Sequence, residues 1–349
     1  MPTSLAHSNR GSAPLPSPFH FVSGGGIIGG SIAYETWGAL SPSKDNAVLL
    51  FTGLSPSAHA ASSSEDPSPG WWEQVIGPDA AFDTRRFFVI CLNSLGSCFG
   101  STGPVSINPA TGVRYGKDFP ALTIEDIAAG GSAVLDHLGV QRAALTAGPS
   151  LGGSAAIAFT ALYPGRARRL LTISGTMAAS AHAIALRSIQ RDAVVHDPVA
   201  GLRLARKLGT VTYRSAQELA ARFGRKPSSQ NNDFAIQDYL EQQAERFSEV
   251  FDPNSFLRLS RAIDLFDFRR HGDPVDVFAR ARLEQALVVG VEEDLLFTIV
   301  EQADIAAALE RAGVPTRFER ISSLAGHDAF LVEQARFSTV VGGWLNASS

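Results

Sequence analysis

The chain has 349 residues, of which 45% are hydrophobic and 18% are charged, and its formal net charge is −4. This composition is typical of a globular protein, and the length allows one large domain with an insertion or two domains. The negative charge, with no run of Lys or Arg, argues against nucleic acid as a partner. We therefore expect small-molecule substrates.

Targeting signals and bound cofactors are not indicated either. Residues 1–18 lack the apolar segment of a signal peptide, and no window of about 18 apolar residues could cross a membrane. Cys91 and Cys98 are too few for a disulfide framework or a CxxC metal site, and no GxGxxG opens a βαβ unit. The sequence predicts a cytoplasmic protein with no metal and no bound cofactor, which begins with a flexible tail over residues 1–18.

Short apolar runs alternate with helical patterns from residue 46 onward. Alternation of this kind predicts parallel strands joined by crossover helices, the α/β class. A helix is expected after Thr123, which forms a capping box with Asp126, and Thr298 and Glu301 repeat the device. The strand candidates are "NAVLLFTG", "RRFFVICLN", "RAALTAG", "RRLLTISG", "QALVVGV" and "TRFERIS".

Strand patterns disappear in the middle of the chain. Segments such as "IALRSIQRDAVVH" and "DYLEQQAERFSEVF" predict helices there. We expect an α/β core over residues 19–176 and 281–349, with an all-helical lid inserted over residues 177–280 above the strand ends.

The segment "TAGPSLGGSAAIAF" places Ser150 between two glycines, after a predicted strand and before a predicted helix. Strand, Gly-x-Ser-x-Gly and helix is the order of a nucleophile elbow, in which a tight turn lifts the serine hydroxyl above the strand ends. The short pattern alone also fits a small residue in a loop. Its context favours a nucleophilic Ser150 in an α/β-hydrolase fold with a mostly parallel sheet.

A nucleophilic serine needs a histidine as base and a carboxylate that orients the histidine. In α/β-hydrolase folds the carboxylate follows the serine in the chain, and the histidine follows the carboxylate. His327 follows the last predicted strand, whereas His271 lies in the charged stretch "FRRHGD", so we predict His327 as the base. Glu292, Glu293 and Asp294 end the preceding strand, and we favour Asp294 because apolar residues follow it directly. The alternatives are that the acidic residues are solvated loop charges, and that Ser150, Asp294 and His327 are three unrelated loop residues.

An oxyanion hole in this fold uses the N–H of the residue after the nucleophile and an N–H from the loop after an earlier strand. Leu151 and Leu54 occupy those two places. Because the donors belong to the main chain, the identity of the side chains matters little.

Long strings of the sequence resemble the homoserine O-acetyltransferase and serine or homoserine O-succinyltransferase family. They run through nearly the whole chain from Leu15 onward. They include "GGSIAYETWGAL", "GWWEQVIGPDAAFDTRRFFVICLNSLGSCFGSTGPVSINPATG", "LGTVTYRS", "FDPNSFLRLSRAIDLFDF" and "GHDAFL". The resemblance implies an acyl transfer from coenzyme A in two steps, with Ser150 as nucleophile, and a homodimer formed through the lid. Succinyl-CoA or acetyl-CoA would be a co-substrate.

The resemblance also implies how the acceptor amino acid is bound. By position, Arg206 matches the arginine that binds the carboxylate of the acceptor, and Asp328 matches the residue that binds its amino group. Opposite charges suit a zwitterion. Without the resemblance, Arg206 would be interpreted as a solvated cation on a helix.

At position 187, in "AHAIALRSIQR", this chain has Arg and so resembles the succinyl-transferring relatives, whereas acetyl-transferring relatives have Asn there. A guanidinium pairs with the free carboxylate of a succinyl group, which an acetyl group lacks. The strings "FTGLSPSAHAA" and "NSLGSC" also resemble the serine O-succinyltransferase branch of the family. Together with Arg187 they favour L-serine O-succinyltransfer in cysteine biosynthesis. The alternatives are a homoserine O-acetyltransferase or O-succinyltransferase of methionine biosynthesis, and an esterase on the same scaffold.

Overall fold

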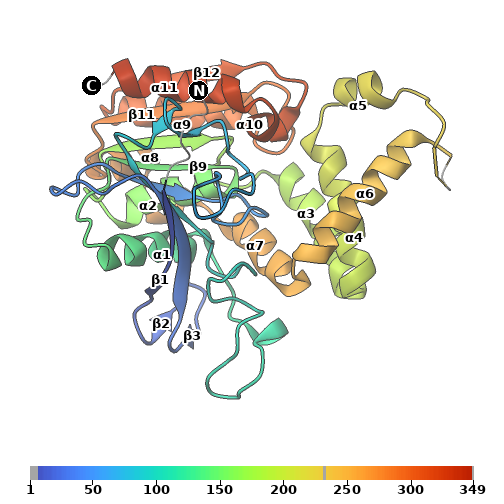
Figure 1. The fold of residues 1–349 in the computed structure, drawn as a ribbon, viewed down its shortest axis with the longest axis horizontal. Coiled ribbons are helices and arrows are strands. Elements are labelled where there is room, and N and C mark those ends of the chain that lie inside the picture. The colour runs from blue at the N-terminus through green and yellow to red at the C-terminus, as the bar shows by residue number, and fades with distance from the viewer. Residues whose placement is uncertain (1–6, 231–232, 348–349) are drawn as a thin grey trace.

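An eight-stranded sheet forms the centre of the computed structural model, which describes residues 7–230 and 233–347 (Figure 1). The strand order is β1-β4-β8-β5-β9-β10-β11-β12. These strands are β1 (Ser8–Pro14), β4 (Ser31–Trp37), β5 (Ala47–Phe51), β8 (Phe88–Leu92), β9 (Leu145–Pro149), β10 (Arg169–Ile173), β11 (Gln285–Val291) and β12 (Thr316–Ile321).

Six of these strands, β8 through β12 in the sheet order, run parallel to one another, whereas β1 and β4 are antiparallel to their neighbours. The parallel part confirms the mostly parallel α/β sheet expected from the alternating sequence pattern. Because the carboxyl ends of parallel strands share one edge, the loops after β5, β9, β11 and β12 gather at that edge. The candidate nucleophile, base, carboxylate and oxyanion-hole residues all follow these four strands, whereas Arg187 and Arg206 lie in the segment after β10.

Both faces of the sheet are covered, so the inner parallel strands β5, β8, β9, β10 and β11 are buried on both sides, whereas the edge strands β1 and β12 are partly exposed. Along β5, Leu49 and Phe51 join one apolar core, whereas Val48 and Leu50 join the other. The first core packs beneath α1 (Ile124–His137), α2 (Leu151–Leu162), α8 (Pro274–Arg280) and α9 (Ile299–Arg311), and the second beneath α11 (Gln334–Ala347). The capping boxes expected at the starts of α1 and α9 are both present.

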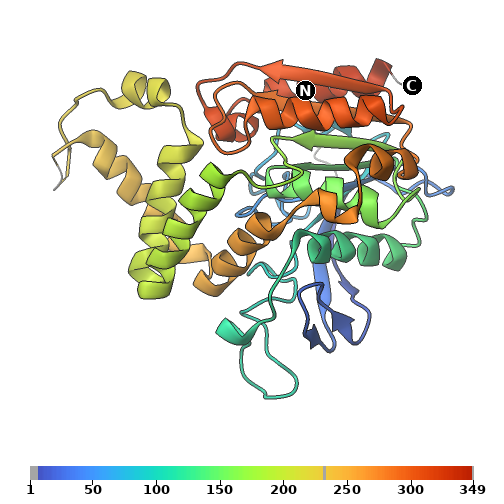
Figure 2. The same cartoon turned by 180° about the vertical axis from the view of Figure 1, so that it is seen from behind.

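A helical insertion, α3–α8, lies between β10 and β11 and confirms the helices expected there. Its helices α3 to α6 project from the core as an arm, and α7 lies between that arm and the sheet (Figures 1 and 2). The helices are α3 (Ala181–His196), α4 (Pro198–Tyr213), α5 (Ala216–Phe223), α6 (Ala235–Val250) and α7 (Pro253–Leu265), before α8.

In the part of the chain that the structure describes, no helix combines the length and the apolarity that a bilayer crossing requires.

Short elements complete the fold. The short elements are β2 (Phe19–His20), β3 (Gly26–Ile27), β6 (Ile76–Gly77), β7 (Phe82–Asp83), α10 (Ala329–Val332) and the 3-10 turns η1 (Gly116–Asp118), η2 (Phe268–His271) and η3 (Gly326–Asp328).

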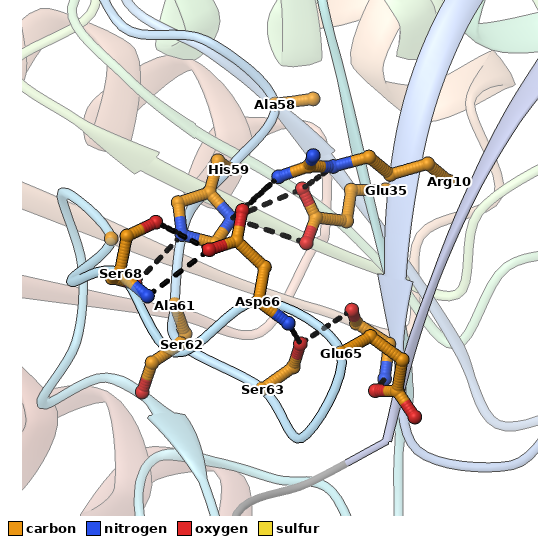
Figure 3. Close-up of polar contacts among 12 residues, drawn as sticks. Arg10, Glu35, Ala58, His59, Ala61, Ser62, Ser63, Glu65, Asp66 and Ser68 are labelled. Atoms are coloured by element: carbon orange, nitrogen blue, oxygen red, sulfur yellow. Dashed lines mark hydrogen bonds and ion pairs between the residues drawn. The ribbon is translucent and has the colours of Figure 1, made fainter.

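The start of the chain differs from the flexible tail expected over residues 1–18. Residues 1–6 lie outside the described part, but β1 pairs with β4 over seven residues. Figure 3 shows one reason: the Arg10 guanidinium donates to Glu35, which is 2% exposed, and to Asp66. His59 Nδ1 lies 3.1 Å from the same Glu35 carboxylate. The sequence of β1 is polar and contains proline, so it shows no strand pattern. The strand forms because partners distant in the sequence stabilise it at the edge of the sheet.

Candidate active site

Ser150 lies on the turn between β9 and α2, as the sequence predicted. Its φ of 57° and ψ of −124° are strained for a residue with a side chain. The turn is held because Ser150 N donates to the Ile173 carbonyl at 2.8 Å. A Cβ on Gly148 would lie 2.3 Å from Gly152 backbone atoms, and one on Gly152 would lie 2.2 Å from the Phe51 carbonyl oxygen. The glycines are therefore required by close backbone contact.

His327 lies in η3, in the loop that follows β12. Its Nε2 lies 2.9 Å from Ser150 Oγ, although the two residues are 177 positions apart in the sequence. Both side chains are largely buried, with Ser150 9% and His327 5% exposed. This is the distance that direct proton transfer between a hydroxyl and an imidazole needs.

Asp294 lies in the loop after β11 and faces the other ring nitrogen. Its Oδ2 is 2.7 Å from His327 Nδ1. Its Oδ1 accepts from the backbone N–H groups of Leu296 at 2.9 Å and Phe297 at 3.0 Å. The carboxylate is thus fixed by its own loop, and it favours the tautomer in which Nδ1 carries the proton and Nε2 is free to accept one.

The other two acidic candidates in that loop are directed elsewhere. Glu292 pairs with Arg320 on β12, with 2.8 Å between Arg320 Nε and Glu292 Oε1. Glu293 accepts from the Ser322 hydroxyl and from the Ser323 backbone N–H, each at 2.7 Å. Of the three, the structure brings Asp294 together with His327.

The surroundings of His327 raise its pKa above the ordinary value. Burial is the largest single influence and lowers the pKa, but the charge of Asp294 and its hydrogen bond outweigh it, with a smaller contribution from Asp328. The Arg187 charge acts in the opposite direction. The ring stacks on Phe297, with 5.0 Å between ring centroids, so its orientation is fixed by packing as well as by Asp294.

The two leucines predicted for the oxyanion hole flank Ser150. Leu151 begins α2, so its N–H is one of the first-turn N–H groups that have no partner inside the helix. Leu54 follows β5 and lines the cavities on both sides of Ser150. The positive end of the α2 dipole also points to this place, which favours a developing negative charge.

Two cavities meet at Ser150 and His327. One extends beneath the helical insertion and is lined by Arg187, Gln190, Phe297 and the Ser150–His327 pair among others. The other is lined by Arg206, Asp328 and Tyr213 together with the same pair. Leu54 and Tyr213 belong to both linings, so the two cavities share the reactive pair and their common wall.

Arg206 and Asp328, the two residues predicted to bind the acceptor, both line the second cavity. Arg206 lies over the rings of Phe247 and Tyr213, at 4.9 and 5.9 Å from their centroids. Its buried Nε has no hydrogen-bond partner among the described residues. Asp328 Oδ2 accepts from Arg214 Nε at 3.1 Å, a contact that the sequence reasoning missed although both residues lie in its quoted motifs.

Arg187 lies in the first cavity and is 7% exposed. Its Nε donates to Asp264 Oδ1 on α7 at 2.6 Å. Its Nη2 is buried and has no hydrogen-bond partner within residues 7–230 and 233–347. Asp264 and the neighbouring Arg191 were not predicted; the signal for Arg191 was its spacing of four residues from Arg187, which puts both on one helix face.

Metal coordination has no candidate in the described part of the chain, where no group of three or more His, Cys, Asp or Glu side chains could hold an ion. The arrangement of Ser150, His327 and Asp294 is one that performs nucleophilic acyl transfer without a metal.

Comparison with known proteins gives the class first. Residues 46–334 match the family model described as alpha/beta hydrolase fold. The structure is similar to the homoserine O-acetyltransferase from Bacillus anthracis, with a TM-score of 0.90, 24% identity, and coverage of 97% of this chain and 98% of that one. Esterase E22 is also similar, with a TM-score of 0.88, 26% identity, and coverage of 97% and 100%. The chain is an α/β-hydrolase-fold protein.

Curated relatives define the family within that class. The serine O-succinyltransferase of Litchfieldella anticariensis is 48% identical, and the match covers 96% of this chain and 98% of that protein. The serine O-succinyltransferase of Stenotrophomonas maltophilia is 46% identical, with coverage of 95% and 96%. The chain belongs to the serine O-succinyltransferase family of acyltransferases.

Proposed function

We propose that this protein transfers a succinyl group from succinyl-CoA to the hydroxyl of L-serine through a covalent intermediate on Ser150. One observation carries the proposal: the cavity that contains the Ser150–His327 pair also contains Arg187, a buried cation with an unpartnered N–H group. Full-length relatives named serine O-succinyltransferase support the same reaction.

In the first half of the reaction, Ser150 Oγ attacks the thioester carbonyl while His327 Nε2 takes its proton. The negative oxygen of the tetrahedral intermediate accepts from the backbone N–H groups of Leu54 and Leu151. When the intermediate collapses, the carbon–sulfur bond breaks and the proton on His327 passes to the departing thiolate. Asp294 stabilises the imidazolium while it exists.

In the second half, the hydroxyl of serine attacks the ester that Ser150 now carries. His327 Nε2 takes the proton of that hydroxyl and returns it to Ser150 Oγ as the new ester leaves. The same Ser150–His327 distance of 2.9 Å therefore serves both halves. The free enzyme is regenerated and O-succinylserine is the product.

The charge of Arg187 selects the acyl group. The Nη2 group of Arg187 donates to the free carboxylate of the succinyl chain, a bond that an acetyl group cannot make. A buried N–H group without a hydrogen-bond partner is energetically costly. The site therefore disfavours an acyl-CoA whose acyl group leaves the Arg187 Nη2 group without a partner.

The acceptor occupies the second cavity. Arg206 binds its carboxylate, and Asp328 binds its ammonium group while Arg214 holds the Asp328 carboxylate in place. This pair of opposite charges fits the backbone groups of an amino acid and is common to serine and homoserine. The preference for serine rests on the relatives.

A hydrolase is the second candidate, because esterase E22 has the same fold at 26% identity. Water rather than an amino acid would then release the acyl group from Ser150. The paired charges of Arg206 and Asp328 favour the transferase, because a simple esterase does not need a receptor for a zwitterion.

We also propose that the protein is cytoplasmic and forms a homodimer through its helical insertion. Large apolar side chains are exposed on the outer surfaces of α3 and α4, where burial against a second copy would stabilise them. They are Ile189, Val195, Val199 and Leu204, which are 58–71% exposed.

The test is thiol release from succinyl-CoA or acetyl-CoA, with serine, homoserine or no acceptor. The proposal predicts the fastest release from succinyl-CoA with serine. A preference for acetyl-CoA would overturn the assignment of the acyl group, and a preference for homoserine that of the acceptor. Release that is indifferent to the acceptor would identify a hydrolase.

A further inference from the structure

A single carboxylate, Asp264 on α7, lies between two arginines of α3. Asp264 Oδ1 is 2.6 Å from Arg187 Nε, and Asp264 Oδ2 is 2.6 Å from Arg191 Nη2. Counting side-chain surface alone, 2% of Asp264, 8% of Arg187 and 12% of Arg191 is exposed, so the trio is largely shielded from water. The helical insertion therefore contains a largely buried chain of cation, anion and cation, of which the proposed acyl transfer uses Arg187 but neither Asp264 nor Arg191.

The charges in this chain do not cancel. Two guanidinium groups face one carboxylate, so the trio has one positive charge in excess. Of the described residues that line the first cavity, Arg187 is the one with a permanent charge, so no carboxylate in that lining compensates it. A buried charge without a partner is unfavourable, and the arrangement becomes favourable when an anion enters the cavity.

The contacts of Arg187 also distinguish its nitrogens, because one is held by Asp264 and another has no partner within the described part of the chain. Asp264 holds Arg187 at Nε, and the Phe297 ring lies 6.0 Å from the guanidinium carbon. Nη2 is left buried and unpartnered. Arg191 is fixed in turn, because its Nη1 donates to the Ser260 hydroxyl at 3.0 Å. Arg191 does not line the cavity, so it acts on a ligand there only through the groups that it holds, Asp264 and Ser260.

We infer that Asp264 and Arg191 are positioning residues for acyl selection, which rests on the succinyl transfer proposed above. Asp264 orients Arg187 so that Nη2 faces the acyl chain. Arg191 neutralises Asp264, so that the charge of Arg187 remains available to the carboxylate of the acyl group. Acyl selectivity thus depends on a residue that does not touch the substrate.

The experiment compares succinyl-CoA with butyryl-CoA, whose acyl chain has the same length and no carboxylate. With serine as acceptor, the ratio of their kcat/KM values measures carboxylate recognition separately from the common chemistry. We expect Asp264→Asn to lower this ratio tenfold or more, mainly by raising KM for succinyl-CoA.

Arg191 gives the sharper pair of variants. Arg191→Gln leaves Arg187 and Asp264 as a neutral pair, so we expect a fall in the ratio similar to that of Asp264→Asn. Arg191→Lys retains the positive charge beside Asp264 and should retain most of the ratio. Asp192→Asn is the matched control, since Asp192 lies on the same helix and lines neither cavity.

Three outcomes would overturn the inference: an unchanged ratio in Asp264→Asn, equal ratios in Arg191→Gln and Arg191→Lys, or losses of the same size with both donors. The last outcome would mean that the trio only stabilises the fold, and thermal unfolding of each variant would show it. The unmodified enzyme is measured first. If it does not use succinyl-CoA, the proposed function fails, whereas the outcomes above concern only the roles of Asp264 and Arg191.

Discussion

The α/β core and the helical insertion contribute to the site in different ways. The core places Ser150, His327 and Asp294 on loops at one edge of the sheet, and backbone hydrogen bonds hold the serine turn and the Asp294 loop. The insertion contributes Arg187 and Arg206 as long side chains on helices, oriented by other side chains. If the site works as proposed, reaction chemistry depends on backbone geometry, whereas substrate choice depends on side-chain charges that a few substitutions can change.

The largest effect is expected in the core, from Ser150→Ala. Removal of the nucleophile should lower kcat by at least about 10⁴-fold, because both half-reactions use Ser150 Oγ. The melting temperature should change little, since alanine fits the same turn. Thiol release and thermal unfolding measure the two effects, and a folded alanine variant with normal turnover would contradict the assignment of the nucleophile.

Asp294→Asn should lower kcat by about 10³–10⁴-fold while the protein stays folded. An amide at this position favours the wrong tautomer of His327, so Nε2 can no longer accept the proton of Ser150. Asp294→Asn should affect succinyl-CoA and acetyl-CoA alike. A change in donor preference instead would show that the core also selects the substrate.

Arg187→Asn should act in the opposite manner, on selectivity rather than chemistry. A charge-assisted hydrogen bond contributes about 1.5–3 kcal/mol, so kcat/KM for succinyl-CoA should fall about 10–100-fold. Turnover of acetyl-CoA should be retained or improved. Equal losses with both donors would remove the distinction between the two regions.

Arg206→Gln should raise KM for serine by about tenfold or more, because the carboxylate of the acceptor loses its cationic partner. The rate of the first half-reaction should be affected little, since the acceptor has not yet bound. Burst kinetics without serine separate the two steps. A slower burst would mean that Arg206 also serves the acyl donor.

The smallest expected effect is on the pH profile. Since His327 must be neutral to act as a base and its pKa is raised, activity should be lost as pH falls through a value above the ordinary 6.5 or so. In Asp294→Asn the main raising influence is gone, so the acidic limb of the residual kcat/KM should move to lower pH. A limb at the same pH in both proteins would contradict the role of Asp294 in setting it.

Much of the core could be predicted from the sequence because its signals are local. The elbow at Ser150 is marked by neighbouring glycines, and the parallel order of the strands brings the loops of Asp294 and His327 to the same edge. The N-terminal strand was missed because Arg10 is paired with Glu35 and Asp66, which are distant in the sequence.

The insertion was less predictable for the same physical reason. Arg187 could be singled out by resemblance, but its partner Asp264 lies 77 positions away on another helix. Similarly, Arg214 meets Asp328 across 114 positions. No periodicity or motif encodes which charged residues of two packed helices will form a pair.

The most direct test of a succinyl-enzyme on Ser150 is intact-mass analysis of the protein mixed with equal amounts of succinyl-CoA and acetyl-CoA, in the absence of serine. We expect a succinyl adduct on Ser150 that disappears when serine is added, and no adduct on Ser150→Ala. In the Arg187→Asn variant we expect an acetyl adduct on Ser150. That result would show that the helical insertion selects the acyl group that the core transfers. Absence of an adduct in the unmodified enzyme, or an adduct lost equally fast with and without serine, would contradict the account.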